Sequence, residues 1–129
     1  MEKEISDKLI RAAEEACGNS YSPYSSFPVG AAVLTSSGKI YAGTNIENAS
    51  YGATMCAERV AIFKAVSQGE RKILAIAVYA GAADKAFPCG MCLQVLSEFA
   101  EDIPVILASE KGSSAYTLSE LLPHRFGEE

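Results

Sequence analysis

The segment from Ile73 to Tyr79 constrains the fold most strongly, because its seven residues are apolar without a break. A strand that is apolar on both faces has to be covered on both sides. The segment therefore predicts the central strand of a sheet packed between helices. The apolar run continues to Ala83 and covers eleven residues, too few for a helix to cross a bilayer. We expect a layered domain that does not enter a membrane.

Helices are expected on both sides of this strand. Apolar residues at helical spacing, bounded by start and stop signals, predict helices over residues 5–17, 55–69, 88–99 and 118–122. Thr54 is expected as the N-cap of the second helix and Pro88 as the first residue of the third. Thr117 and Glu120 form a capping box at the start of the last helix.

The remaining strands predict how the sheet begins and continues. They are expected over residues 29–34, 39–44 and 105–108, and Ser37-Gly38 forms a hairpin turn between the first two. An initial hairpin followed by alternating helices and strands predicts a mixed sheet covered by helices. We therefore predict an α/β fold with a single domain over residues 1–129.

Charge and cysteine content narrow the function. The net charge is -5 and no basic stripe is present, which argues against nucleic acid as a partner and favours a small molecule. The N-terminal residues MEKEISDK lack the apolar centre of a signal peptide, so a cytoplasmic location is expected. Four cysteines in a reducing compartment indicate metal binding or catalysis before disulfides.

Three of these cysteines predict a metal centre. Cys89 and Cys92 are three residues apart, which places both thiols on one face of a helix. Cys56 belongs to the preceding predicted helix, and all three cysteines lie in or near a first helical turn. Free N–H groups and the helix dipole favour thiolates there. Three thiolates from two helix starts predict a tetrahedral Zn²⁺ site, one per subunit, with one position left open for catalysis.

A fourth protein ligand would instead make the zinc site structural. Cys17 is the last residue of the first predicted helix, and His124, the only histidine, lies near the C-terminus. Neither has a ligand-like partner at short range, so we interpret Cys17 as a packing residue and His124 as a solvated one. An open, catalytic site is the prediction, and a zinc-stabilised module without activity stays as an alternative.

Glu58 and Arg59 follow the first zinc ligand directly. A carboxylate beside an activated water, but not bound to the metal, can accept its proton and deliver it to a substrate. Glu58 suits this role because the helix around it is largely apolar. Three thiolates and Zn²⁺ sum to a net charge of -1, and Arg59 could offset that charge by donating to a sulfur. A surface position for Arg59 is an equally good interpretation of the sequence.

Together these motifs resemble those of the zinc-dependent cytidine deaminases of the small homotetrameric type. The resemblance covers nearly the whole chain. It rests on CAER at 56–59 and PCGMC at 88–92, with YSPYS at 21–25, FPVGAA at 27–32, NIENASY at 45–51, FKAV at 63–66 and LLP at 121–123. It implies a three-layer fold with a mixed five-stranded sheet flanked by helices.

The same resemblance implies an activity, which is hydrolytic deamination of cytidine and 2′-deoxycytidine to uridine and 2′-deoxyuridine in pyrimidine salvage, with release of ammonia. It implies that Glu58 protonates N3 and carries a second proton to the leaving amino group. Asn45 and Glu47 would bind the ribose 3′-hydroxyl. Phe27 would pack on the pyrimidine and Ala57 would offer its backbone N–H to the base. Phe126 would close the site of a neighbouring subunit in a homotetramer.

Two positions depart from the family pattern. Leu93 stands where the family usually has an arginine, and Met91 where it usually has a small residue. The loss of a second cation should leave more of the charge compensation to Arg59. Leu93 could also change the packing around the helix that carries the metal ligands, and accommodate modified cytidines.

Other interpretations remain open at this level. A deaminase for a different aminopyrimidine, such as blasticidin S, has a similar metal motif, although Asn45 and Glu47 argue against it. Buried acceptors of that kind reject ligands that lack a hydroxyl group. Capping of their own loop is the less favoured interpretation of both residues. A deaminase that edits nucleic acid is disfavoured by the acidic composition.

Overall fold

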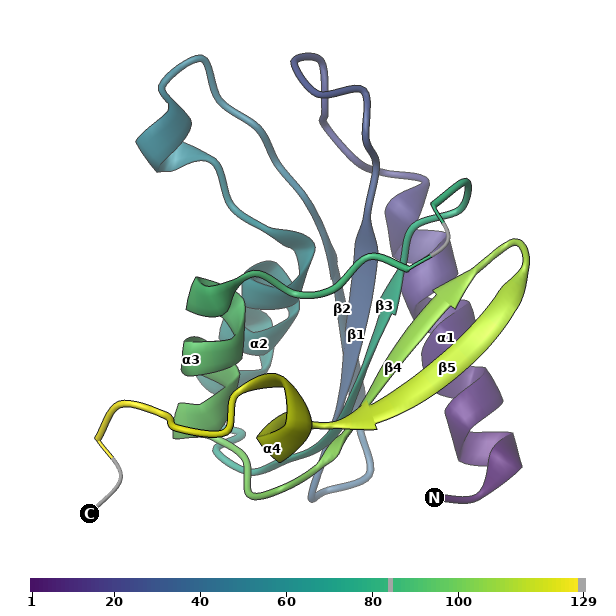
Figure 1. Cartoon of the computed structure of the whole chain (residues 1–129), viewed down its shortest axis with the longest axis vertical. Coiled ribbons are helices and arrows are strands. Elements are labelled where there is room, and N and C mark those ends of the chain that lie inside the picture. The colour runs from purple at the N-terminus through teal and green to yellow at the C-terminus, as the bar shows by residue number, and fades with distance from the viewer. Residues whose placement is uncertain (84, 128–129) are drawn as a thin grey trace.

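Five strands form one sheet, and helices pack on both of its faces (Figure 1). The computed structural model describes residues 1–83 and 85–127. Its elements are α1 (Lys3–Cys17), β1 (Gly30–Thr35), β2 (Ile40–Thr44), the 3-10 helix η1 (Tyr51–Ala53), α2 (Ala57–Ser67), β3 (Ile73–Tyr79), α3 (Gly90–Glu98), β4 (Pro104–Ser109), β5 (Gly112–Thr117) and α4 (Leu118–Leu121). The predicted α/β class and the mixed five-stranded sheet are confirmed.

The apolar segment that dominates the sequence is the middle strand of the sheet. The strand order is β2-β1-β3-β4-β5. β3 pairs antiparallel with β1 and parallel with β4, where Ile76 lies opposite Val105. The parallel step is made by α3, which connects β3 to β4, while antiparallel pairs complete the sheet on both sides.

Side chains of alternate strand residues point to opposite faces of the sheet and form two apolar layers. On one face Val33, Ile76 and Val105 pack with residues of α2 and α3, including Ile62 and Leu96. On the other face Ala32, Ala77 and Ile106 pack against Leu9 and Ala13 of α1. Figure 1 shows α1 alone on one side of the sheet, with α2 and α3 together on the other. This is the predicted three-layer arrangement.

Two glycines allow helices to lie directly on the sheet. A Cβ atom on Gly30 of β1 would lie 1.9 Å from the carbonyl oxygen of Ala13 in α1. A Cβ atom on Gly43 of β2 would lie 2.6 Å from the backbone nitrogen of Ala61 in α2. Because α2 starts at the proposed metal centre, its contact with Gly43 helps to fix the position of that centre.

Two local predictions are wrong, and one strand was not predicted. Thr54 does not cap α2; its Oγ1 accepts a hydrogen bond from the backbone N–H of Asn48, and Cys56 takes the N-cap position. Likewise Cys89 is the N-cap of α3, so Pro88 precedes the helix. β5 was not among the strands predicted from the residue pattern, because it lies at the sheet edge and most of its residues are exposed.

The remaining predictions agree with the structure within a few residues. α1 ends at Cys17 before Gly18, and Gly38 adopts the positive φ of 89° that its hairpin turn requires. The capping box is present at the start of α4, where Thr117 accepts from the backbone N–H of Glu120 and Glu120 accepts from that of Thr117. In the described part of the chain, no helix combines the length and hydropathy needed to span a membrane.

Candidate metal centre and active site

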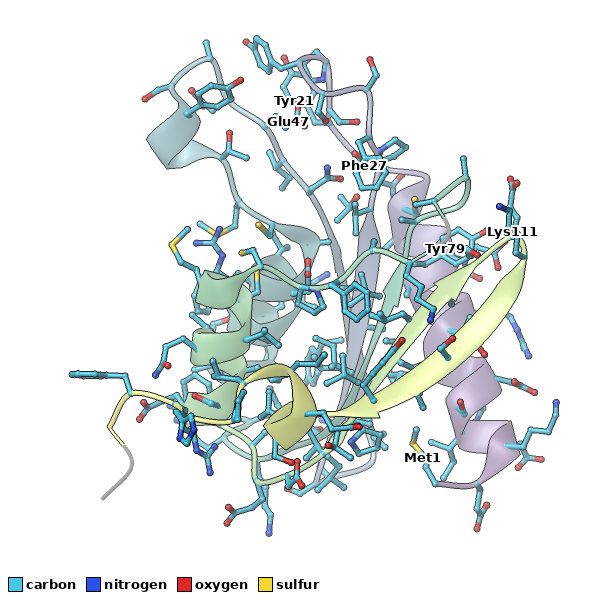
Figure 2. All side chains as sticks on the ribbon, viewed as in Figure 1. Met1, Tyr21, Phe27, Glu47, Tyr79 and Lys111 are labelled. Atoms are coloured by element: carbon cyan, nitrogen blue, oxygen red, sulfur yellow. The ribbon has the colours of Figure 1, made fainter. Side chains whose placement is uncertain are left out.

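Two helix starts bring the three predicted cysteines together. Cys56 is the N-cap of α2 and Cys89 is the N-cap of α3, and both have extended backbone conformations. Cys92 lies in the first turn of α3 and is buried. Figure 2 shows sulfur atoms gathered where α2 and α3 begin. The free N–H groups and dipoles of both helices therefore act on the same small volume.

The three sulfur atoms have the spacing that a zinc ion needs. The Sγ atom of Cys89 lies 4.0 Å from that of Cys56 and 3.5 Å from that of Cys92, and all three lie within 4.8 Å of one another. Tetrahedral zinc with bonds of about 2.3 Å to sulfur separates its ligands by about 3.8 Å. The cluster therefore fits a zinc ion in both the chemistry and the spacing of its donors.

A fourth ligand is absent from this cluster in the described part of the chain, where no His, Asp, Glu or further Cys joins the three sulfurs. The Cys17 thiol instead interacts with the backbone of Gly81, and burial raises its pKa. His124 lies exposed after α4. Among the described residues the cluster therefore has three protein donors.

Arg59 is directed at the sulfur cluster and not into solvent. Its Nη2 donates to Sγ of Cys56 at 3.3 Å. A hydrogen bond from Cys92 and a second from Arg59 lower the pKa of the Cys56 thiol to about 5. The Nε–H of Arg59 is buried and has no acceptor among residues 1–83 and 85–127. Attraction to the thiolates has to offset the cost of that unpaired donor.

Glu58 is the buried carboxyl group of the site. It is the second residue of α2 and only 6% of its surface is exposed. Burial raises the pKa of Glu58 to about 7, and the nearby Cys56 sulfur acts in the same direction. A carboxyl group with a pKa near neutrality can both accept and donate a proton under physiological conditions.

A cavity of about 280 Å³ connects the sulfur cluster with two loops. It contains four of the predicted residues, Phe27, Asn45, Glu47 and Glu58, together with the two ligands Cys56 and Cys89. Phe27 and Glu47 are labelled in Figure 2, on the two loops that follow α1 and β2. A larger hollow, of about 440 Å³ between α1, β2 and α2, contains none of these residues.

Asn45 holds the loop that carries Phe27. Its Oδ1 accepts from the backbone N–H of Val29 at 3.0 Å and from the Ser20 hydroxyl at 2.5 Å, and its Nδ2 donates to the Phe27 carbonyl at 2.9 Å. These contacts engage only one of the two N–H groups of the amide. Loop capping, the alternative interpretation of Asn45, is thus present, and it leaves one donor for a ligand.

Glu47 also holds this loop, through contacts with Tyr24 and Ser25. Its carboxylate accepts from the backbone N–H groups of Tyr24 and Ser25 at 2.9 and 3.1 Å and from the Ser25 hydroxyl. The hydrogen bond from the Ser25 hydroxyl is the main cause that lowers the pKa of Glu47, and the two backbone hydrogen bonds lower it further. A carboxylate offers about four lone-pair sites, so one acceptor site remains for a hydroxyl group of a ligand.

Ala57 and Phe126 differ in their relation to the cavity. Ala57 is buried as the first residue of α2, where its N–H has no partner within the helix. Phe126 is 89% exposed and does not line the cavity of its own chain. The backbone N–H and C=O of Phe126 form hydrogen bonds with the Gln94 side chain on α3. These bonds fix the position of the backbone from which the ring projects.

The structure adds residues that the sequence did not single out. Val78, Ala86 and Phe87 line the cavity together with Met55 and Thr54. Phe87 comes two residues before Cys89, yet a single aromatic residue in a loop has no periodicity that could identify it. Leu93, which departs from the family pattern, is 7% exposed within the apolar layer, whereas Met91 is 63% exposed.

Known proteins are similar to this chain in sequence and in fold. Residues 3–108 match the family model described as the cytidine and deoxycytidylate deaminase zinc-binding region. A cytidine deaminase of Sporosarcina psychrophila is 48% identical over 95% of this chain and 92% of its own length. The crystal structure of a cytidine deaminase from Burkholderia pseudomallei has a TM-score of 0.88 and 40% identity, and covers 98% of this chain and 100% of its own.

A cytidine deaminase of Mycobacterium tuberculosis shows the same fold at a greater sequence distance. Its crystal structure has a TM-score of 0.82 at 36% identity and covers 95% of this chain and 98% of its own. These matches agree with the three-cysteine cluster and the mixed sheet. The chain therefore belongs to the zinc-binding family of cytidine and deoxycytidylate deaminases.

Proposed function

We propose that this chain hydrolyses cytidine and 2′-deoxycytidine to uridine and 2′-deoxyuridine, with release of ammonia, as a cytoplasmic enzyme of pyrimidine salvage. Residues 1–129 would act as one domain. The observation that carries the proposal is the position of Glu58. This buried carboxyl group lies in one cavity with two of the three clustered thiols and with the hydrogen-bonding pair Asn45 and Glu47.

The thiols of Cys56, Cys89 and Cys92 would hold the zinc ion. When bound, zinc supplies the Lewis acidity that brings the pKa of water close to neutrality. Arg59 withdraws negative charge from the Cys56 sulfur through its hydrogen bond, which preserves that acidity. In the net reaction the oxygen of water becomes bonded to C4, the bond from C4 to the amino nitrogen breaks, and ammonia leaves.

Glu58 would move the two protons that this exchange requires. It would accept one proton from water and donate it to N3 of the pyrimidine, and then accept the second proton of the attacking oxygen and deliver it to the leaving amino group. Its burial and its pKa of about 7 suit both directions of transfer. Ala57 would donate its free backbone N–H to the base, and Phe27 would pack against the pyrimidine ring.

Asn45 and Glu47 would bind the ribose 3′-hydroxyl as donor and acceptor. Each retains hydrogen-bonding capacity toward the cavity after its loop contacts are made. These contacts favour a nucleoside over free cytosine or blasticidin S. Steady-state kinetics with cytidine, cytosine and blasticidin S tests the assignment. We expect cytidine to be the best substrate, and a higher kcat/KM for either of the others would overturn it.

We infer in addition a homotetramer in which Phe126 closes the site of a neighbouring subunit. Its exposure and its fixed backbone support this role. Mixing two inactive variants, Phe126→Ala and Glu58→Gln, and allowing subunits to exchange tests it. Shared sites predict that activity returns on mixing, because some sites then combine an intact Glu58 with an intact Phe126. No recovery with exchanged subunits would contradict it.

A further inference from the structure

The loop before α3 places a second aromatic ring in the wall of the cavity. Ala86, Phe87 and Cys89 from this loop line the cavity that also contains Phe27 and Glu58. Phe87 is only two residues from Cys89, so the segment that carries its ring leads directly to a residue of the sulfur cluster. About half of the Phe87 surface, 52%, is exposed. The ring is therefore available to a ligand.

Strand β5 holds this ring in place from outside the cavity. The rings of Phe87 and Tyr116 pack with their centroids 5.3 Å apart and their planes tilted by 60°. Such aromatic pairs contribute about 0.5–1.5 kcal/mol beyond their buried area. Nζ of Lys85, in the same loop, donates to the Tyr116 hydroxyl at 2.9 Å. Tyr116 thus contacts the loop at two positions.

The chain itself restricts Phe87 as well. The next residue is Pro88, and a residue before proline is confined to extended conformations. Because Pro88 restricts the backbone of Phe87 and Tyr116 packs against its ring, the Phe87 ring forms a part of the cavity wall whose position is fixed. A wall of fixed position can exclude a ligand group by its size, whereas a mobile side chain would move aside.

The chemistry of cytosine indicates which part of the base this wall meets. C4, the reacting carbon, has two ring neighbours, N3 and C5. In the proposed reaction Glu58, from α2, serves N3. Phe87 lines the same cavity from a different segment, the one that leads to α3. Its ring could therefore contact the other neighbour of C4, which is the C5 edge. That edge carries only C–H groups, and an apolar ring can cover it without leaving any hydrogen-bonding group unpaired.

We propose that Phe87 is a specificity-determining residue, whose ring covers the C5 edge of the cytosine and limits the substituent that C5 can carry, and that Tyr116 is its positioning residue. The inference rests on the proposed deamination of cytidine. It narrows the substrate class to cytosine nucleosides with a small C5 substituent. A 5-hydroxymethyl group is disfavoured more strongly than a 5-methyl group, because its hydroxyl would lose its hydrogen bonds to water against the ring.

The test compares kcat/KM for cytidine with kcat/KM for 5-methylcytidine and 5-hydroxymethylcytidine on the same preparation. The ratio does not depend on the fraction of protein that is folded or zinc-loaded. Phe87→Ala should raise the relative kcat/KM of both modified substrates about tenfold or more, the scale of discrimination by one methyl-sized group. Phe87→Leu should change it little. Tyr116→Ala should shift it in the same direction, whereas Tyr116→Phe should not.

Phe63→Ala is the matched control, because Phe63 is 43% exposed on α2 and does not line the cavity. An unchanged ratio in Phe87→Ala, or an equal shift in Phe63→Ala, would overturn the inference. Calorimetric titration with uridine and 5-methyluridine provides a readout without turnover, and Phe87→Ala should narrow the gap between their affinities. A wild-type protein that neither deaminates cytidine nor binds uridine would refute the proposed function itself.

Discussion

Nη2 of Arg59 donates a hydrogen bond to Sγ of Cys56 at 3.3 Å, three residues back along the same chain segment. Cys56 is the N-cap of α2 and Arg59 lies in the first turn, so one helical turn provides both a metal ligand and the cation that offsets its charge. Glu58 lies between them in sequence. The CAER motif is therefore a local unit, whose geometry is set by the start of a single helix.

Arg59→Ala should lower both the zinc content and kcat. Changes beside a metal ligand typically cost about 10–100-fold in metal affinity or activity. The loss should be larger here than in a family member that has a second arginine where this chain has Leu93. Zinc-to-protein ratios and kcat, measured for both proteins, check this. Equal losses in the two backgrounds would contradict it.

Leu93→Arg in this chain cannot replace that comparison. Leu93 is 7% exposed and packs in the apolar layer between α2, α3 and the sheet. The apolar residues around Leu93 in this chain would have to accommodate a longer, charged side chain, so the substitution would change packing as well as charge. The comparison therefore has to be made between natural backgrounds.

Glu47→Gln should reduce the preference for cytidine over 3′-deoxycytidine. The amide keeps an oxygen for the backbone N–H groups of Tyr24 and Ser25, so the loop should remain in place. A hydrogen bond to a charged group contributes about 1.5–3 kcal/mol, which corresponds to roughly a 10- to 150-fold loss of kcat/KM for cytidine. The same loss for 3′-deoxycytidine would show that Glu47 acts only through the loop.

Gly43→Ala should destabilise the fold by about 1–3 kcal/mol, the usual cost of overpacking. The new Cβ would lie 2.6 Å from the backbone nitrogen of Ala61 and 2.8 Å from Cβ of Val60. Gly52→Ala is the matched control, since its Cβ would meet nothing within 4 Å. Chemical denaturation of both variants measures the difference. Equal stabilities would disprove the close approach of β2 and α2.

Cys17→Ser should leave zinc content and kcat unchanged. Its thiol interacts with Gly81 and belongs to none of the metal-binding groups found among the described residues. Cys92→Ser provides the contrast, and we expect it to lose zinc. A Cys17→Ser protein without metal would instead support the structural, four-cysteine interpretation.

The sequence predicted the metal centre better than the ends of the helices around it. The spacing of Cys89 and Cys92 is a local property, and the prediction that both thiols face one point held. Thr54 and Pro88 are good helix-start residues, but each helix begins later, because Cys56 and Cys89 occupy the N-cap positions. The local preference of Thr54 and Pro88 for helix starts therefore did not decide where the two helices begin.

The missed elements depend on long-range contacts. β5 has the sequence GSSAYT, which lacks a clear apolar alternation, and it is a strand because its backbone pairs with β4 from Gly112 to Thr117. Phe87 likewise lines a cavity with Phe27, and its ring packs against Tyr116, nearly thirty residues later in the sequence. Neither relationship leaves a periodic signal in a single sequence.

The most direct test follows the ultraviolet absorbance of cytidine with the Glu58→Gln protein at a measured zinc content. Glutamine preserves the shape of the side chain but cannot exchange protons. We predict one zinc per chain, as in the wild type, and a kcat lower by about 10²–10⁴-fold, the usual contribution of acid–base catalysis. The wild type should lose its activity on chelation and regain it with zinc. A zinc-loaded Glu58→Gln protein that deaminates cytidine at the wild-type rate would contradict the account.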